Sequence, residues 1–281
     1  MTALPFDISV NDHIAHLQFN RPEAYNSMNK VFWQTFTDAL EALDIAAEAR
    51  VLVISSTGKH FCAGMDLEIF TQPNPKLFGG EAGRRAEAMR RLVLQLQDCF
   101  SALETIRIPV ITAIQGGCIG GALDLVCAAD MRYCTEDAFF TVKETELGMT
   151  ADLGTLQRLP TLIPMGLARE LAYTGRKFTS EEALRAGLVN QVYPDQAAML
   201  AGVFDIAKQI ASRSPLAVTG CKQMINYARD HSTADSLSYM ATWQAGMFQP
   251  TDMMQTFSAK MSGKEPRFEA LRPIDKPFAT E

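Results

Sequence analysis

An α/β fold with parallel strand pairing is what this sequence of 281 residues predicts. Two short, almost wholly apolar runs, 51–55 and 109–114, have the length and composition of strands that are buried on both faces of a sheet. Helical patterns alternate with these runs, and such alternation is typical of parallel sheets. After about residue 195 the pattern is helical, with predicted helices at 196–211, 215–230, 232–247 and 250–261.

The remaining elements follow from turn signals and from the spacing of apolar residues. Residues 6–20 alternate in polarity around Asn11-Asp12 and predict a β-hairpin. Asn29 is a typical N-cap residue at the start of a helical pattern. Residues 71–80 are rich in proline and glycine and predict a loop. The helix after Asn29 and the helix after the loop each have one apolar face, made by Phe32, Phe36, Leu40 and Leu43 in the first and by Met89, Leu92, Val93 and Leu96 in the second.

Composition argues against several functions. The chain is 47% hydrophobic and 21% charged, which suits one large core, and its formal net charge is −6. An acidic chain without basic runs is not suited to gripping a nucleic acid backbone. The six cysteines form no C-x-x-C pair, so we expect buried free thiols in a reducing compartment. The four histidines have no metal-type spacing, and no metal site is expected.

The termini and the longest apolar stretch bear on location. The N-terminal sequence MTALPFDISV has neither the basic nor the apolar region of a signal peptide, and the C-terminal KPFATE is not a peroxisomal address. We therefore expect a cytoplasmic protein. Residues 108–129 approach the length of a membrane span, but their glycines and Asp124 favour a buried strand that leads into a buried helix. No membrane association is expected.

A glycine run, GGCIGG at 116–121, lies between the predicted strand 109–114 and the predicted helix 122–129. The first N–H groups of a helix have no partners within the helix. Glycines let a ligand approach that backbone closely, so the run could bind an oxyanion. A tight turn without any ligand is the equally simple alternative.

Acidic residues in apolar surroundings form the second feature of interest. Asp124 lies three residues after Gly121, on the same helix face, among apolar neighbours. Glu144, Glu146 and Asp152 follow a strand that ends near residue 142, and Asp152 lies in an unusually apolar loop. Buried carboxylates are costly unless compensated. They indicate either a structural hydrogen bond or a reaction centre, whereas acids in loops are most often simply solvated.

Three segments, HFCAGMDL at 60–67, QGGCIGGALDL at 115–125 and AADMR at 128–132, resemble the oxyanion segments of the crotonase (enoyl-CoA hydratase/isomerase) family. The resemblance runs from about residue 6 to residue 267. It implies a ClpP-like ββα-repeat core with a C-terminal helical trimerisation region, and an oxyanion hole formed by the N–H groups of Met65 and Gly121. Residues that would lie along the substrate are Ala63, Gly64, Asp66, Leu67 and Gly120.

The acids define the reaction within that family. Simple hydratases typically carry Glu at the positions of Asp124 and Glu144, whereas the trio Asp124, Glu144 and Asp152 is similar to that of the Δ3,5-Δ2,4-dienoyl-CoA isomerases. This resemblance implies that Glu144 is the base at C2, Asp152 is the acid at C6, and Asp124 supports them. An enoyl-CoA hydratase, a single-acid Δ3,Δ2-enoyl-CoA isomerase and a non-catalytic or RNA-binding protein of this fold remain alternatives.

The resemblance also implies ligands and partners. Coenzyme A is part of the substrate, no separate cofactor is expected, and Arg21, Lys59 and Lys260 are candidates to meet its phosphates. Residues 1–195 would hold the CoA and catalytic sites, and residues 196–281 would serve oligomerisation and part of the acyl-CoA pocket. A trimer or a dimer of trimers is expected. Apolar residues that suit such an interface, or equally a private core, are Met240, Trp243, Met247, Phe248, Met253, Met254 and Phe257.

Overall fold

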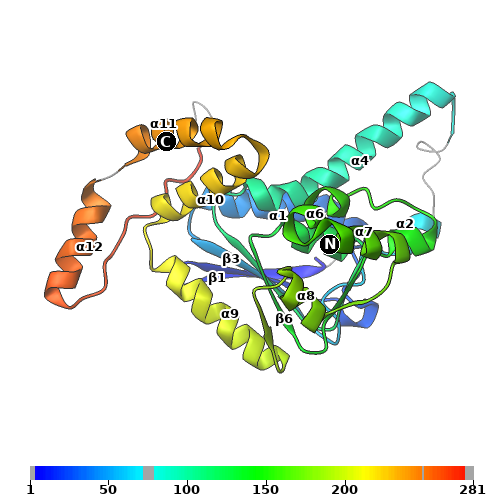
Figure 1. Ribbon diagram of the computed structural model, residues 1–281, viewed down its shortest axis with the longest axis horizontal. Coiled ribbons are helices and arrows are strands. Elements are labelled where there is room, and N and C mark those ends of the chain that lie inside the picture. Colours follow the sequence, from blue (N-terminus) through cyan, green and yellow to red (C-terminus); the bar gives the residue numbers. More distant parts are fainter. Residues whose placement is uncertain (1–3, 72–78, 249, 276–281) are drawn as a thin grey trace.

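A six-stranded sheet with the strand order β1-β2-β3-β4-β6-β9 forms the centre of the fold in the computed structural model, which describes residues 4–71, 79–248 and 250–275 (Figure 1). Strands β1 and β2 are antiparallel, and all the other neighbours are parallel. The strands are β1 (Phe6–Asn11), β2 (Ile14–Phe19), β3 (Val51–Ser56), β4 (Val110–Ile114), β6 (Met131–Thr135) and β9 (Gln191–Tyr193).

The predicted hairpin is confirmed, with its turn one residue later than the sequence signal. Asp12 and His13 form the turn, and both have positive φ angles, 49° and 63°. The two predicted buried strands are also confirmed. Every residue of β3 and β4 is buried, because helices cover both faces of the sheet.

Side chains that alternate along the strands form two cores. Val51 and Val53 pack with α9 (Gln196–Ala211) on one face of the sheet. Leu52 and Ile54 point to the other face, which α1 (Lys30–Ala46), α4 (Ala82–Thr105) and α5 (Gly121–Ala128) cover. Asn29 caps α1 as predicted, since its side chain accepts a hydrogen bond from the N–H of Phe32.

A second, three-stranded sheet carries the glycine run. Its order is β5-β7-β8, with β5 (Gly117–Ile119), β7 (Phe139–Thr141) and β8 (Phe178–Thr179). The middle of the glycine run is therefore a strand, and the turn that leads into α5 is confined to Gly120. The remaining short elements are η1 (Pro22–Ala24), α2 (Glu68–Thr71), η2 (Glu144–Leu147), α6 (Thr155–Leu162), α7 (Met165–Thr174) and α8 (Ser180–Ala186).

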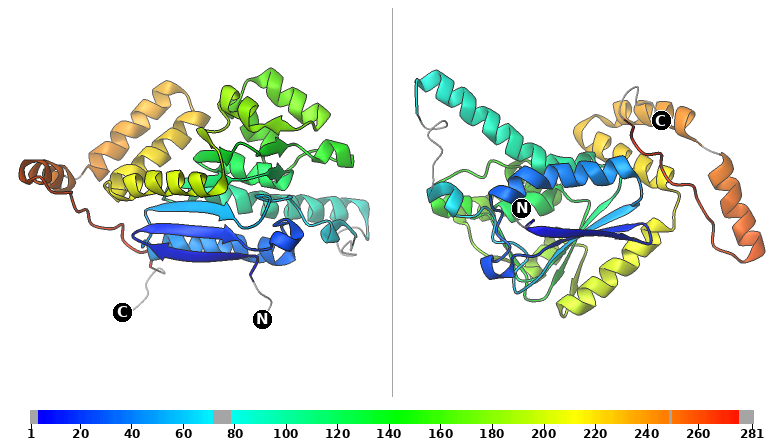
Figure 2. Two further views of the ribbon diagram at one scale, coloured as in Figure 1. Left: turned by 90° about the horizontal axis from the view of Figure 1, so that it is seen from below. Right: turned by 180° about the vertical axis from the view of Figure 1, so that it is seen from behind.

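The four C-terminal helices match the predicted ranges closely, with α10 (Pro215–Asp230), α11 (Thr233–Met247) and α12 (Pro250–Ser262) following α9. Helix α9 packs on the main sheet, whereas α12 lies away from the core (Figures 1 and 2). Of the predicted loop 71–80, residues 72–78 lie outside the described residues. No helix in the described part of the chain is long and apolar enough to cross a membrane.

Candidate active site

The two glycine segments predicted to act together lie side by side. The Cys62 N–H donates to the Gly117 carbonyl and the Ile119 N–H donates to the Cys62 carbonyl, both at 3.1 Å. Gly64 has a φ of +83°, and a Cβ there would lie 2.5 Å from the Ile119 carbonyl oxygen. Glycine is therefore required at Gly64 to let the segments meet.

The N–H groups of Met65 and Gly121 lie next to each other at this contact. The Met65 nitrogen is 3.7 Å from the position that a Cβ on Gly121 would occupy. Gly121 begins α5, so its N–H has no acceptor within the helix. Among the hydrogen bonds of residues 4–71, 79–248 and 250–275, neither N–H is a donor. Two adjacent free donors at a helix start can bind an oxyanion.

Glu144 lies against the turn that presents these donors. Gly120 has a φ of +55°, and a Cβ on it would lie 2.9 Å from Oε1 of Glu144. Glu144 begins η2, directly after the short strand β7. Burial raises the pKa of its carboxyl group to about 7, and the negative charges of Asp124 and Asp152 contribute in the same direction. A carboxylate with such a pKa is a competent base near neutral pH.

Asp124 fits both roles that the sequence left open, a structural hydrogen bond and a place in the candidate reaction centre. It is only 1% exposed, one turn after Gly121 on α5, and its Oδ1 accepts a hydrogen bond of 2.5 Å from the N–H of Thr155. Burial raises the pKa of Asp124 to about 6, hydrogen bonding from Thr155 opposes that rise, and the charge of Asp152 adds to it. The carboxylate thus joins α5 to the start of α6 and also belongs to the acid cluster.

Asp152 lies between two buried residues, Ala151 and Leu153, and is itself exposed in the isolated chain. Burial raises its pKa, and hydrogen bonding to its own backbone N–H opposes that rise. Its charge raises the pKa values of Asp124 and Glu144, so the three carboxyl groups form one interacting cluster. Glu146, in contrast, is exposed and pairs with Lys143.

The residues expected along the substrate are distributed around the oxyanion segment. Asp66 accepts hydrogen bonds from Ser27 Oγ at 2.9 Å and from the Glu68 N–H at 3.1 Å, and it pairs with Arg21 at 3.5 Å. Burial raises the pKa of Asp66, but these bonds outweigh burial and hold the pKa below its usual value. The charges of Asp66 and Arg21 are therefore already engaged with each other.

Four other candidates differ in how accessible they are and in where they lie. Ala63 is half-buried, whereas Leu67 is 66% exposed. Lys59 is exposed, just beyond β3, where a cation could reach a phosphate in solvent. Lys260 lies on α12, which extends away from α5 and η2 (Figure 1), so in a single chain it does not join the acid cluster.

Several functional contacts were not predicted from the sequence. The N–H of Gly117 donates to Nδ1 of His60 at 2.9 Å, which fixes the chain just before the oxyanion turn. Thr155 donates to Asp124 through its backbone. Gln97 donates to the backbone carbonyl of Asp152, and Arg158 donates to that of Leu153. The spacing of polar residues along α4 indicates a polar helix face but not what that face contacts, so the sequence carries no signal for these contacts.

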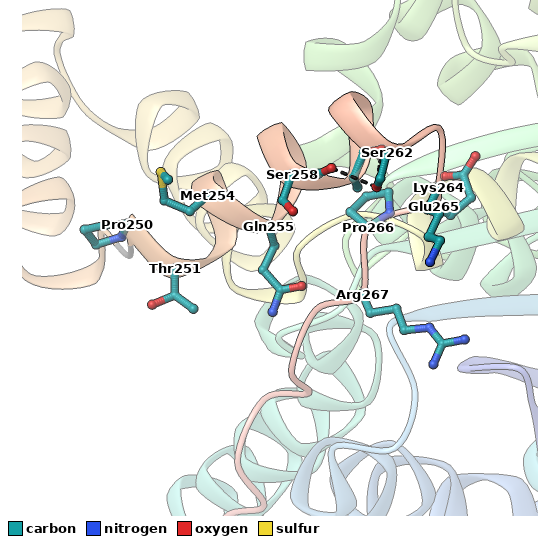
Figure 3. A pocket seen from close by; sticks show the side chains of 11 residues that line it. Pro250, Thr251, Met254, Gln255, Ser258, Ser262, Lys264, Glu265, Pro266 and Arg267 are labelled. Carbon is teal, nitrogen blue, oxygen red and sulfur yellow. Dashed lines mark hydrogen bonds between the residues drawn. The ribbon is translucent and has the colours of Figure 1, made fainter.

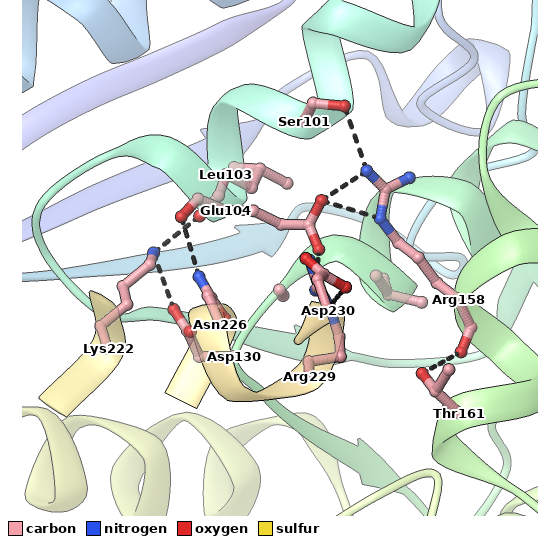
Figure 4. A network of polar contacts seen from close by, with 12 residues as sticks. Ser101, Leu103, Glu104, Asp130, Arg158, Thr161, Lys222, Asn226, Arg229 and Asp230 are labelled. Carbon is pink, nitrogen blue, oxygen red and sulfur yellow. Dashed lines mark hydrogen bonds and ion pairs between the residues drawn. The ribbon is translucent and has the colours of Figure 1, made fainter. Parts of the chain in front are cut away.

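A cavity of about 400 Å³ adjoins the loop that carries Asp152, at the polar network drawn in Figure 4. Its lining includes Gln97, Ser101, Glu104, Leu153 and Arg158. Within the described residues there is no cluster of three or more His, Cys, Asp or Glu side chains arranged to hold a metal ion.

All six cysteines are free thiols, as expected. Five of them are buried, and Cys221 is exposed, which corrects the expectation that all are buried. Burial raises the pKa values of the Cys62 and Cys127 thiols to about 12, so these two are unreactive.

These features define an acyl-thioester enzyme of the crotonase type. It has an adjacent pair of backbone donors, a base that lies against the turn presenting them, and a helical C-terminal region. The sequence profile of the enoyl-CoA hydratase/isomerase family matches residues 9–269, so the chain belongs to that family. The predicted crotonase-type α/β fold is confirmed.

Individual relatives carry more specific names. The chain is 43% identical over 258 residues to the mitochondrial Δ3,5-Δ2,4-dienoyl-CoA isomerase of Homo sapiens, covering 92% of this chain and 79% of that one. It is 42% identical to the peroxisomal Δ3,5-Δ2,4-dienoyl-CoA isomerase of Arabidopsis thaliana, covering 94% and 95%. The crystal structure of an enoyl-CoA hydratase from Bacillus anthracis superimposes with a TM-score of 0.85 at 28% identity, covering 94% and 98%.

Proposed function

We propose that this protein isomerises 3,5-dienoyl-CoA to 2,4-dienoyl-CoA in the oxidation of unsaturated fatty acids. The observation that carries the proposal is the third carboxyl group, Asp152, which lies three residues before the Thr155 N–H that donates to Asp124, and whose charge raises the pKa values of Asp124 and Glu144. The names of relatives that are 42% and 43% identical over more than nine-tenths of the chain support the same reaction.

The reaction requires two proton transfers at separated carbons. C2 and C6 are four bonds apart, about 5 Å in an extended chain with bonds of about 1.5 Å. One carboxylate can serve C2 and C4 but not readily C2 and C6, so two carboxyl groups solve the problem of reach. Each general acid or base of this kind typically contributes about 100- to 10,000-fold to the rate.

The steps balance without any further reactant. Glu144 takes the C2 proton, and the electron pair moves onto the thioester oxygen, which the N–H groups of Met65 and Gly121 stabilise. The electron pair then moves from the thioester oxygen back into the carbon chain, and the double bonds shift to C2=C3 and C4=C5. C6 takes the proton of Asp152. Glu144 ends protonated and Asp152 ionised, and exchange with solvent restores both groups. Loss of one oxyanion donor in comparable sites costs about 3 kcal/mol.

Glu144 is assigned to C2 because it lies against Gly120, next to the donors for the carbonyl that is bonded to C2. A pKa of about 7 leaves it ionised in most molecules above that pH. Asp152 must carry a proton in the complex. Its pKa is already raised in the isolated chain, and an acyl chain laid over this exposed carboxyl group would exclude water and raise it further.

A panel of acyl-CoA substrates tests this proposal. Conversion of a 3,5-dienoyl-CoA, followed by the absorbance of the conjugated 2,4-dienoyl product, is the expected activity. Faster hydration of crotonyl-CoA would instead identify a hydratase, and faster conversion of a 3-enoyl-CoA would identify a single-acid isomerase. Binding of acyl-CoA with no turnover on any of these substrates would identify a non-catalytic protein.

For the substrate itself, we propose that coenzyme A enters along 63–67 and Gly120, with Lys59 or Arg21 near its phosphates. No separate cofactor takes part. Of the two cations, Lys59 is the better candidate, because Arg21 is already paired with Asp66.

We also propose a homo-oligomer, a trimer or a dimer of trimers, built through residues 196–281. Exposed apolar side chains on α11 and α12 support it, because in a single chain they have no core to join. A cavity of about 1100 Å³ between α12 and residues 264–267 adds to this argument, since a partner could fill it (Figure 3). The side chains are Met240, Met247, Phe248, Met253, Met254, Phe257 and Met261.

The cytoplasm is the compartment that we propose, on the grounds of the six free thiols. The relatives named above are mitochondrial and peroxisomal proteins. Fractionation of cells that produce the full chain tests the proposal, and recovery in an organelle would overturn it.

A further inference from the structure

One face of α4 holds the backbone of the loop that carries Asp152. Gln97, Ser101 and Glu104 are spaced i, i+4 and i+7, so they lie along the same side of the helix. All three line the cavity of about 400 Å³ that adjoins the loop. No step of the proposed reaction uses them.

Gln97 makes the direct contact. Its Nε2 donates a hydrogen bond of 2.6 Å to the backbone carbonyl of Asp152. The flanking side chains of Ala151 and Leu153 are each only 4% exposed, so they are anchored in the core. The carboxyl group of Asp152 is itself exposed in the isolated chain, and its position therefore depends on how the backbone is held.

Ser101 and Glu104 act on the same loop through Arg158. The guanidinium group of Arg158 donates to Ser101 Oγ at 3.1 Å and to Glu104 Oε2 at 2.5 Å and 3.0 Å. It also reaches the carbonyl of Leu153 at 3.5 Å. The group lies directly over Gly154, whose φ is +129°, and a Cβ on Gly154 would collide with it.

Helix α10 completes this frame. Arg229 pairs with the other carboxylate oxygen of Glu104, and Asn226 donates to the Glu104 carbonyl at 3.1 Å (Figure 4). The Arg158–Glu104 pair is largely buried, with about 15% of each side chain exposed. Three helices therefore hold the loop, and among the residues that the structure describes Gln97 alone bonds to the residue that would deliver the proton.

We propose that Gln97 is a positioning residue that fixes Asp152 for proton delivery at C6 by holding its backbone carbonyl. The inference rests on the proposed isomerase function. A misplacement of about 1 Å at a reacting group can cost about 100-fold in rate. Loss of one hydrogen bond to the loop should displace the Asp152 carboxyl group by less than this distance, so we expect about a tenfold loss in rate.

Gln97→Met tests the inference, because methionine keeps the length of the side chain and loses the donor. The turnover number for 3,5-dienoyl-CoA should fall about tenfold while KM changes less than about twofold. Exchange of the C2 proton with deuterium from solvent, which needs Glu144 and the oxyanion donors but not Asp152, should stay near the wild-type rate. Gln95→Met, at an exposed position on the same helix, is the matched control and should match the wild type in both assays.

Two further variants keep the outcome decisive. Gln97→Asn retains the amide but shortens its reach, so it should fall between the wild type and Gln97→Met. In an Asp152→Asn background, Gln97→Met should cause no further loss of the residual isomerisation, because both changes act on proton delivery at C6. Wild-type turnover in Gln97→Met, or equal losses of exchange and isomerisation, would overturn the inference. Wild-type enzyme that fails to isomerise dienoyl-CoA would instead overturn the proposed function.

Discussion

The carboxylate of Glu144 lies directly against the backbone of Gly120, with Oε1 2.9 Å from where a Cβ on Gly120 would be. Gly120 also donates its N–H to the Thr141 carbonyl at 3.0 Å, just before Glu144 in the chain. The turn that precedes the oxyanion donors and the residue that supplies the base are thus held together. Any side chain at residue 120 would disturb both.

Gly120→Ala should therefore lower activity severely. The added Cβ would displace the Glu144 carboxylate, and a φ of +55° with a ψ of −121° is unfavourable for alanine. We expect about a 100-fold loss of turnover and about 1–3 kcal/mol loss in the free energy of unfolding. Steady-state kinetics and urea unfolding measure the two effects.

Gly166→Ala provides the control for this substitution. Gly166 lies in α7, and no atom lies within 4 Å of the position of its missing Cβ. Alanine favours a helix over glycine by about 0.5–1 kcal/mol, so this variant should be equally or more stable and fully active. Full activity in Gly120→Ala would show that the contact with Glu144 has no functional consequence.

Glu144→Gln should abolish isomerisation and leave binding of CoA intact. The amide keeps the shape of the side chain but cannot take the C2 proton. Loss of about 100- to 10,000-fold is the expected range for a general base. Turnover of 3,5-dienoyl-CoA and calorimetric titration with an acyl-CoA analogue measure the two properties. Near-wild-type turnover would remove Glu144 from the mechanism.

The same carboxyl group should set the pH dependence. Because Glu144 must be ionised to act as a base, its contribution to kcat/KM should rise with pH up to about 7, its pKa in the free enzyme, whereas loss of the proton that Asp152 must carry should lower kcat/KM at higher pH. The charge of Asp124 raises that pKa, so Asp124→Asn should move the rising limb to lower pH. If kcat/KM of this variant rises over the same pH range as in the wild type, the coupling between Asp124 and Glu144 is contradicted.

The contribution of Glu144 to folding stability should decrease as the pH rises, whereas its contribution to activity increases. The pKa of Glu144 is about 7 in the folded chain and 4.5 for an unperturbed glutamate, so the folded state holds its proton more strongly. This contribution therefore favours folding below about pH 4.5 and is lost as the pH rises to about 7. Relative to the wild type, Glu144→Gln should be more stable at pH 8 than at pH 5. Urea unfolding at the two pH values provides the measurement.

Strong local patterns made much of the fold predictable from the sequence. The apolar runs of β3 and β4, the cap at Asn29 and the long amphipathic helices each have a period or an end signal that depends on a few neighbouring residues. The small sheet was not predicted, because β5 has only three residues and starts with Gly117. Such a strand exists through its pairing with β7, which the local sequence does not encode.

The candidate site likewise has residues that the sequence indicated and contacts between distant segments that it did not. Glycine motifs and acids in apolar surroundings indicated Gly121, Asp124 and Asp152 as candidates, and the resemblance to the crotonase family selected Glu144. The contact from Gln97 to Asp152 spans 55 residues and could not be read from either segment. The i, i+4, i+7 spacing of Gln97, Ser101 and Glu104 forms a polar face on α4 that was not predicted, and the spacing does not specify what that face contacts.

The assembly proposed through the C-terminal helices can be tested by introducing one charged side chain. Phe257 is 51% exposed on α12, among the apolar side chains proposed for the interface. Phe257→Asp should lower the mass of the main species in sedimentation velocity. Tyr173→Asp, at a 73% exposed position on α7, should leave it unchanged. An unchanged mass in the Phe257 variant would place the interface elsewhere.

Asp152 gives the last prediction, because it separates a dienoyl-CoA isomerase from other members of the family. If Glu144 serves C2 and Asp152 serves C6, their carboxyl groups face each other across a slot for a flat diene. Their separation in a complex should be about 5–8 Å, which is the C2-to-C6 distance plus room at each end.

Asp152→Asn should therefore uncouple the two proton transfers. The variant should still exchange the C2 proton of a 3,5-dienoyl-CoA with deuterium from solvent, since Glu144 and the oxyanion donors remain. It should form little 2,4-dienoyl product, because no acid is left to supply C6. Mass spectrometry of the recovered substrate and absorbance of the product measure the two steps in one sample. An Asp152→Asn enzyme that isomerises at the full rate would show that this carboxyl group is only a solvated acid in a loop, and a single acid, Glu144, would then have to serve both carbons.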